Sequence, residues 1–155
     1  MALYPCTADK SDDIISGSIT SLCSYVSSAK SFALAYCSRL VDVTLPNLLS
    51  APSAFLQGCY ILEKIDFGKL EQLGSQTFTN CNNLQTLIIR TNQVCSINNI
   101  NAFSGTPFWS TGSGGTLYVP QALIASYQAD TNWATVLAFN ANNQISAIEG
   151  SPYEN

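Results

Sequence analysis

Apolar positions recur along the chain with a period of 22 residues between residues 34 and 91. The apolar columns keep this register across consecutive copies with no insertion between them. Copies of fixed length with the same apolar positions indicate a solenoid, in which each copy forms one coil and each column becomes a row of side chains along the axis. The columns are Leu34, Leu56 and Phe78; Cys37, Cys59 and Cys81; Leu40, Leu62 and Leu84; Val43, Ile65 and Leu87; and Leu45, Phe67 and Ile89.

Segments 40–45, 62–67 and 84–89 each read Leu-x-x-apolar-x-apolar. The alternation that ends each segment predicts a strand with one inward and one outward face. Because alternate side chains on a regular sheet project together, the outward positions of successive strands should form two rows. The first row is Asp42, Lys64, Thr86 and Thr116, and the second is Thr44, Asp66, Ile88 and Tyr118.

These strand segments, with Leu70, the run Leu73-Gly74-Ser75 and Phe78-x-x-Cys81, resemble the BspA-like class of bacterial leucine-rich repeats. The resemblance extends from Ile19 to about Glu149. It implies an α/β repeat fold, a short leucine-rich-repeat solenoid of parallel strands. It also implies a non-enzymatic surface module for adhesion or recognition, of the kind found on bacterial surfaces and in phage-encoded proteins.

The chain is expected to divide into an N-terminal cap or attachment segment (1–18), repeats (19–119), and a C-terminal cap and tail (120–155). Cys6 belongs to no column. Residues 19–34 predict a degenerate first repeat, since terminal repeats are usually atypical. Its expected core positions are Cys23, Val26, Ala29 and Leu34.

A fourth repeat is interrupted. Cys95 aligns with Leu73, and three extra residues then lie within 96–102. After them Phe103 aligns with Phe78, and a five-residue insertion forms the loop 110–115. Further expected alignments are Thr106 with Cys81, Trp109 with Leu84, and 117–120 with 43–46. Trp109 is expected in the core, with Phe108 as an alternative exposed contact.

The last part of the chain predicts a small helical cap. Pro120 suits the first position of a helix, and Thr131 is the expected N-cap of a second one. A loose tail is expected at 152–155. The apolar faces of the helices are Leu123, Ile124 and Tyr127, then Trp133, Val136 and Leu137; Ile145 and Ile148 predict a closing edge strand. The run from Tyr118 to Glu149 is similar to the endings of many BspA-like chains.

Charge is sparse for a chain of 155 residues with ten acidic and six basic side chains. Lys and Arg are too few for a surface that follows nucleic-acid phosphates. No stretch is long enough to span a membrane, and residues 1–18 do not read as a signal peptide. We therefore expect cytoplasmic synthesis and display on a phage virion, otherwise on a bacterial surface. The chain being a fragment of a longer protein stays open.

Histidine is absent from the sequence, which removes His-activated nucleophiles and HExxH metal sites. Asp42, Lys64 and Asp66 predict a solvated ion-pair patch rather than an acid–base pair. We expect no enzymatic activity, no cofactor and no metal. Most cysteines fall in core columns, which favours reduced thiols over a disulfide or a metal site. The glycine-rich run 112–115 favours a flexible insertion over a phosphate cradle.

The two outward rows, extended by Arg90, form the expected binding face. Strands about 4.8 Å apart make it only about 20 Å long, so tight attachment would need many copies. The hypothesis is a module that binds a cell-surface glycan or protein; the alternative is a virion decoration or fibre subunit that mainly contacts copies of itself. The candidate binding residues are Asp42, Thr44, Lys64, Asp66, Thr86, Ile88, Arg90 and Tyr118.

Overall fold

A computed structural model describes residues 2–3, 17–19, 26–110 and 112–155. A six-stranded parallel sheet, the large sheet, has the order β11-β10-β8-β6-β4-β2. A three-stranded parallel sheet, the small sheet, has the order β5-β7-β9. The strands of the large sheet are β2 (Gly17–Ile19), β4 (Leu40–Leu45), β6 (Lys64–Phe67), β8 (Thr86–Ile89), β10 (Thr116–Val119) and β11 (Gln144–Ala147). Those of the small sheet are β5 (Ser50–Ala51), β7 (Gln72–Leu73) and β9 (Ser96–Ile97).

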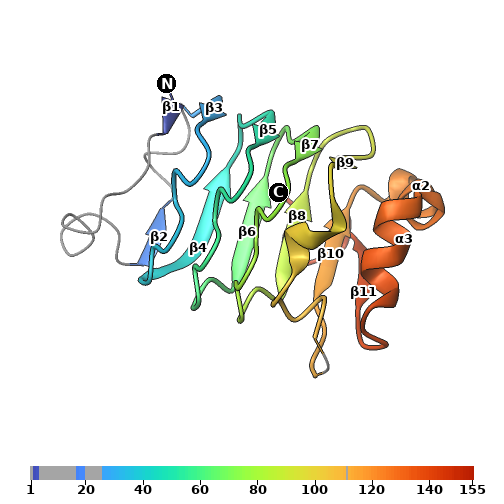
Figure 1. The fold of residues 1–155 in the computed structure, drawn as a ribbon. Coiled ribbons are helices and arrows are strands. Elements are labelled where there is room, and N and C mark those ends of the chain that lie inside the picture. The colour runs from blue at the N-terminus through green and yellow to red at the C-terminus, as the bar shows by residue number, and fades with distance from the viewer. Residues whose placement is uncertain (1, 4–16, 20–25, 111) are drawn as a thin grey trace.

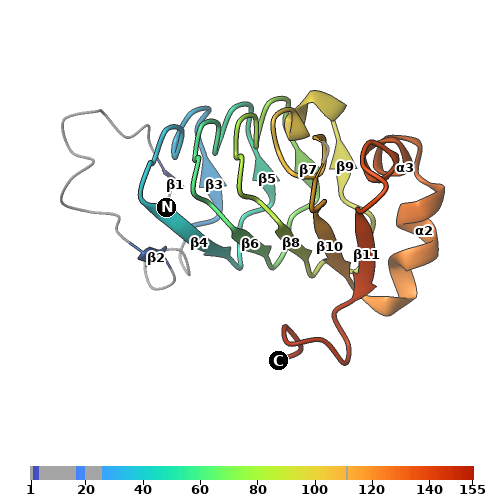
Figure 2. The same ribbon diagram turned by 90° about the horizontal axis from the view of Figure 1, so that it is seen from below.

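The coils stack side by side into a solenoid (Figure 1). The coils that contain β4, β6 and β8 each continue into a strand of the small sheet and then return through an irregular turn (Figure 2). At the N-terminal end β1 (Ala2–Leu3) pairs with β3 (Ser28–Ala29), and β2 pairs with β4. The expected boundary at residue 18 therefore falls inside β2. Cys6 and Cys23 lie outside the described residues.

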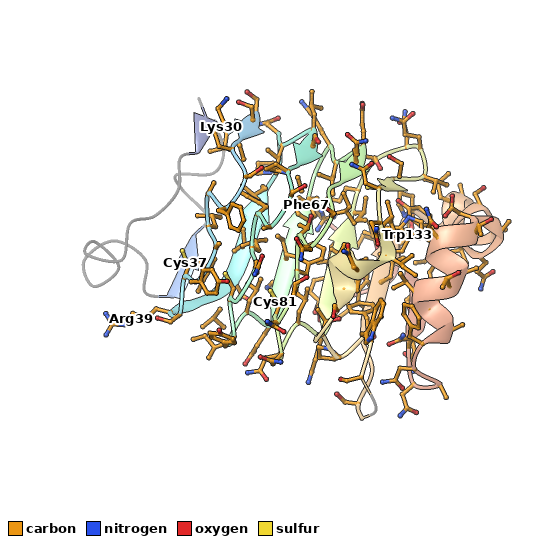
Figure 3. The ribbon with its side chains drawn as sticks, in the orientation of Figure 1. Lys30, Cys37, Arg39, Phe67, Cys81 and Trp133 are labelled. Atoms are coloured by element: carbon orange, nitrogen blue, oxygen red, sulfur yellow. The ribbon has the colours of Figure 1, made fainter. Side chains whose placement is uncertain are left out.

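The predicted apolar columns form the core. Every member of the five columns is buried, with at most 6% of its surface exposed. Phe67 lies in the coil interior and Trp133 at the C-terminal end, whereas Lys30 and Arg39 point outward (Figure 3). The predicted strands are confirmed, although β6 and β8 begin two residues later than expected. β4 alone begins at its leucine because β2 pairs with it from Leu40 onward.

The turns opposite the large sheet are also bonded from coil to coil. The amide of Leu34 donates to Phe55 O at 3.0 Å, and that of Leu56 donates to Thr77 O at 2.9 Å. These turns place two residues per coil in the left-handed region, at a spacing of 22. The values of φ are 62°, 56° and 58° for Phe32, Ala54 and Gln76, and 60°, 73° and 62° for Tyr36, Gly58 and Asn80.

The fourth coil differs from its predicted alignment. The partner of Leu73 in the small sheet is Ile97, not Cys95. Two of the three extra residues therefore precede Ile97, and one follows it. Cys95 is nevertheless fully buried. Phe103 does align with Phe78, since the ring centroids are 5.4 Å apart and Phe78 N donates to the adjacent Ala102 O.

The two ends of the loop 110–115 are packed against the rest of the fold. Phe108 is fully buried, so the alternative of an exposed contact is wrong. Trp109 is half-buried, with its ring centroid 3.9 Å from that of Phe139. A Cβ on Gly115 would lie 2.3 Å from the Phe108 ring, so glycine is required for this close approach. Asn143 fixes the loop by accepting from Gly115 N at 2.9 Å and donating to Phe108 O at 2.8 Å.

A helical cap covers the fourth coil at the C-terminal end (Figure 1). The cap comprises η4 (Gln121–Leu123), α2 (Ile124–Ala129) and α3 (Thr131–Ala138). The N-cap of α3 is Asp130, not Thr131, because the Asp130 carboxylate accepts from Asn132 N and Trp133 N, each at 3.0 Å. The predicted closing strand is confirmed as β11, which pairs with β10.

Candidate functional site

The outward face of the large sheet carries the predicted rows. Asp42, Lys64 and Thr86 are register partners on β4, β6 and β8, and Thr116 continues that row on β10. Thr44, Asp66, Ile88 and Tyr118 form the second row in the same way. The sheet therefore brings these side chains together, because strands in register project equivalent positions from one face. Their use in binding stays a prediction.

Ion pairs divide the charged part of this face in a way that the sequence did not show. Lys64 Nζ lies 3.4 Å from Asp42 Oδ2. Asp66 is instead held by Arg90, whose Nε and Nη2 donate to its two oxygens at 2.9 and 2.8 Å. The expected Asp-Lys-Asp cluster is therefore two separate pairs. The Arg90–Asp66 pair is bidentate and more buried, with side chains 23% and 14% exposed.

Ile88 is not available as a surface residue in this structure. It points outward, between Asp66 and Tyr118 in its row, yet it is fully buried. The other candidate binding residues are each half-buried. An outward-facing isoleucine with no exposed surface must be covered by another part of the chain.

One segment that packs on this face is 150–155, which turns back below the large sheet (Figure 2). The Tyr153 ring packs edge-on against Tyr118, with centroids 4.8 Å apart. Lys64 Nζ lies 6.0 Å from the Tyr153 centroid, at the outer limit of a cation–π contact. The segment expected to be a loose tail is thus folded onto the candidate binding face.

An open pocket of about 310 Å³ adjoins Arg90 at one end of this face. Its lining comes from the turns that follow β4, β6 and β8. Thr91 Oγ1 donates to Gln93 O at 2.8 Å and holds the last of these turns in shape. The lining combines polar, charged and apolar side chains: Leu49, Lys69, Glu71, Arg90, Thr91, Asn92 and Gln93, with Gly68.

The buried thiols have no arrangement suited to chemistry. Cys37, Cys59, Cys81 and Cys95 are buried, as the column positions predict. Cys59 Sγ donates to Leu34 O at 3.0 Å, and Cys81 Sγ donates to Leu56 O at 3.1 Å. These thiols therefore join successive turns by hydrogen bonds. The interaction with the Cys81 side chain and burial raise the pKa of Cys59. Burial and the nearby Glu71 raise the pKa of Cys95 to about 12.

The described ranges contain no side-chain cluster suited to a metal ion and no membrane-spanning helix. No group of three or more His, Cys, Asp or Glu side chains there could hold a metal ion. None of the helices in those ranges is long and apolar enough to cross a bilayer.

A solenoid of parallel strands with a short helical cap and a regular outward face defines a leucine-rich-repeat protein, a class that serves in general as a scaffold for protein interaction. Residues 15–111 match the family model for the BspA type leucine rich repeat region in six copies. The chain belongs to this family. No curated protein and no solved structure matches the chain.

Sequence reasoning missed the contribution of Tyr153 to the face. Its only signal is that it is the one aromatic residue in the otherwise small or polar segment 150–155. Register could not place it, because it lies after the last strand and outside the repeat.

Proposed function

We propose that the chain is an adhesion or recognition module whose large-sheet face binds a protein or glycan on a cell surface. The observation that carries this proposal is the alignment of charged, hydroxyl and aromatic side chains in two rows on a rigid sheet. Because the apolar side chains of the same strands are committed to the core, the outward rows are the part of each strand that can vary for recognition.

The charges on this face favour a ligand that is read by shape and hydrogen bonds rather than by net charge. The carboxylates of Asp42 and Asp66 are paired with Lys64 and Arg90, so the four charges balance. Thr44, Thr86 and Thr116 add hydroxyl groups that can donate or accept.

Display in many copies, on a phage virion or a bacterial surface, belongs to the same proposal. A face about 20 Å long offers few contacts, and linking several copies raises the overall affinity without any new contact. A single copy should therefore bind weakly, and a cluster of copies should bind strongly.

The test compares the wild-type chain with Thr86→Glu, both tetramerised on a biotin-binding carrier, for staining of bacterial cells in flow cytometry. The added carboxylate lies in the middle of the first row and should abolish staining. The matched control is Gln72→Glu, which adds the same charge on the small sheet. Periodate and protease treatment of the cells separates a glycan from a protein ligand. Equal staining by all three chains would overturn the proposal.

The second candidate is a structural subunit that associates end to end. The observation that favours it is that β2 and β11 are the outermost strands of the large sheet and run parallel, so β11 of one copy could pair with β2 of another. Light scattering over a concentration series, repeated after deletion of residues 1–18, tests it. An oligomer that dissociates on deletion supports self-association, and a monomer throughout rejects it.

A further inference from the structure

The segment 150–155 is a folded turn with its own hydrogen bonds. Gly150 N donates to Glu154 Oε2 at 2.6 Å, which closes the turn across its ends. Inside it, Tyr153 N donates to Ser151 Oγ at 3.1 Å. Ser151 in turn anchors the segment to the end of the sheet, since its N and Oγ both donate to Ile148 O, at 3.0 and 2.6 Å. The turn therefore presents the Tyr153 ring in a defined direction.

The position of the Tyr153 ring follows from its two neighbours. Lys64 lies on β6 and Tyr118 on β10, and β8 runs between these strands. Adjacent strands are about 4.8 Å apart, so β6 and β10 are separated by about 10 Å. The Tyr153 ring, 4.8 Å from the Tyr118 ring and 6.0 Å from Lys64 Nζ, thus contacts one residue from the strand on each side of β8. The outward residues of β8 are Thr86 and Ile88, and Ile88 is fully buried.

We propose that Ile88, Tyr118 and Lys64 form a subsite for an aromatic side chain of a protein ligand, and that Tyr153 occupies this subsite in cis. The inference deepens the proposed function, on which it rests. An apolar floor, an aromatic wall and a cation opposite it suit the faces and edges of a tyrosine ring. The occupant present in the structure is a tyrosine in a polypeptide turn, which is why the partner is a protein that presents an aromatic residue in a turn.

Cis occupancy makes the 150–155 segment a competitor of the ligand. A segment attached at Ile148 competes at an effective concentration in the millimolar range, typical of short linkers. A ligand must displace the ring before it can use the subsite. Removal of the ring should therefore raise the affinity for an aromatic ligand.

The test follows the Ile88 δ1 methyl signal by NMR in the full chain, with Ile88→Val to assign it. In the wild-type chain the ring above it should shift this signal upfield, and Tyr153→Ala should move it downfield. A synthetic peptide with the sequence of residues 149–155, added to the Tyr153→Ala chain, should return the signal towards its wild-type position at millimolar concentration. The same peptide with alanine in place of tyrosine should not. In the wild-type chain, where Tyr153 already occupies the subsite, the same peptide should leave the Ile88 signal in place.

Glu154→Ala provides a second variant that keeps the ring but opens the turn at Gly150. It should give an intermediate Ile88 signal. An Ile88 signal that Tyr153→Ala leaves unchanged would overturn the inference, as would a Tyr153→Ala chain that responds to N-acetylglucosamine but not to the peptide. These readouts need no natural ligand. If Thr86→Glu stains cells as the wild-type chain does but the Tyr153→Ala chain responds to the peptide, the proposed function is rejected and the subsite remains.

Discussion

Trp133 donates its indole N–H to the main-chain oxygen of Cys95 at 2.6 Å, from the first turn of α3 into the interrupted coil. The neighbouring Tyr127 hydroxyl accepts from Cys95 N at 3.0 Å. Both peptide groups beside Cys95 are thus satisfied by the cap and not by a following coil. In the earlier coils, main-chain N–H and C=O groups pair with those of the next coil. In the last coil, the main-chain groups of Cys95 pair with two aromatic side chains instead.

Trp133→Phe should lower the free energy of unfolding by about 2–4 kcal/mol, because it leaves the buried Cys95 oxygen without a donor and removes part of a packed ring. Urea unfolding followed by far-UV circular dichroism measures this. Gln128→Ala, at an exposed position on α2, is the control and should change the value by less than about 0.5 kcal/mol. Equal effects of the two substitutions would contradict the role given to the indole.

The turn residues with left-handed φ predict opposite effects of glycine substitution at two exposed glutamines. Gln76 has φ of 58°, so Gln76→Gly should stabilise the fold by about 0.5–1 kcal/mol. Gln85 is not among the left-handed residues, and Gln85→Gly should destabilise it by about the same amount. Thermal unfolding of both variants checks the sign.

Gly58→Ala should destabilise the fold by about 1–2 kcal/mol for the same reason. The φ of Gly58 is 73°, and an added Cβ would lie 2.5 Å from the Tyr36 ring. The Tyr36→Ala/Gly58→Ala double variant separates the two causes. If the ring were the main obstacle, the double variant would be no less stable than Tyr36→Ala.

The ion pairs on the large-sheet face should differ in strength. The Arg90–Asp66 pair is bidentate and mostly buried, and double-mutant cycles should give a coupling of about 1–2 kcal/mol. The Lys64–Asp42 pair is a single contact at 3.4 Å with side chains about one-third exposed, and it should give less than about 0.5 kcal/mol. Arg90→Lys should reproduce most of the loss seen in Arg90→Ala, since lysine cannot form the bidentate contact.

Stability should fall in alkaline solution. The pKa of Cys95 rises from 9.0 to about 12 in the fold, and burial also raises the pKa of Tyr127. Above pH 9 the unfolded chain releases protons that the folded chain retains, so the free energy of unfolding decreases from pH 9 towards pH 12. Urea midpoints at pH 7, 9 and 10.5 test this. In Cys95→Val the decrease should be smaller, and a midpoint that rises with pH would contradict the assignment.

The repeats were predictable because one strict period fixed five columns and both outward rows at once. The errors have local causes. Cys95 was aligned with Leu73 because it is apolar and at the right spacing, but two extra residues move Ile97 into that place. Thr131 and Asp130 are both good caps, and only the main-chain conformation decides between them.

The coverage of the candidate site could not be predicted in the same way. Ile88 follows the outward period, so the pattern indicates exposure, whereas Ile88 is buried and a turn outside the repeat packs on Tyr118 beside it. The sequence predicts that Arg90 lies beside the face. Its ion pair with Asp66 depends on side-chain geometry, which the repeat pattern does not give. Period and register fix where a strand residue points, not which later segment packs on it.

The coil-to-coil hydrogen bonds in the sheets and in the opposite turns have a mechanical consequence. They run along the axis, so tension applied there loads a complete set of bonds at each boundary between coils. The interrupted coil between β8 and β10 would then release a longer unit, and the regular coils would each release one repeat of 22 residues. Each release of a regular coil lengthens the molecule by about 70 Å, given about 3.3–3.6 Å per extended residue. A pulled chain would therefore extend one coil at a time rather than in a single step.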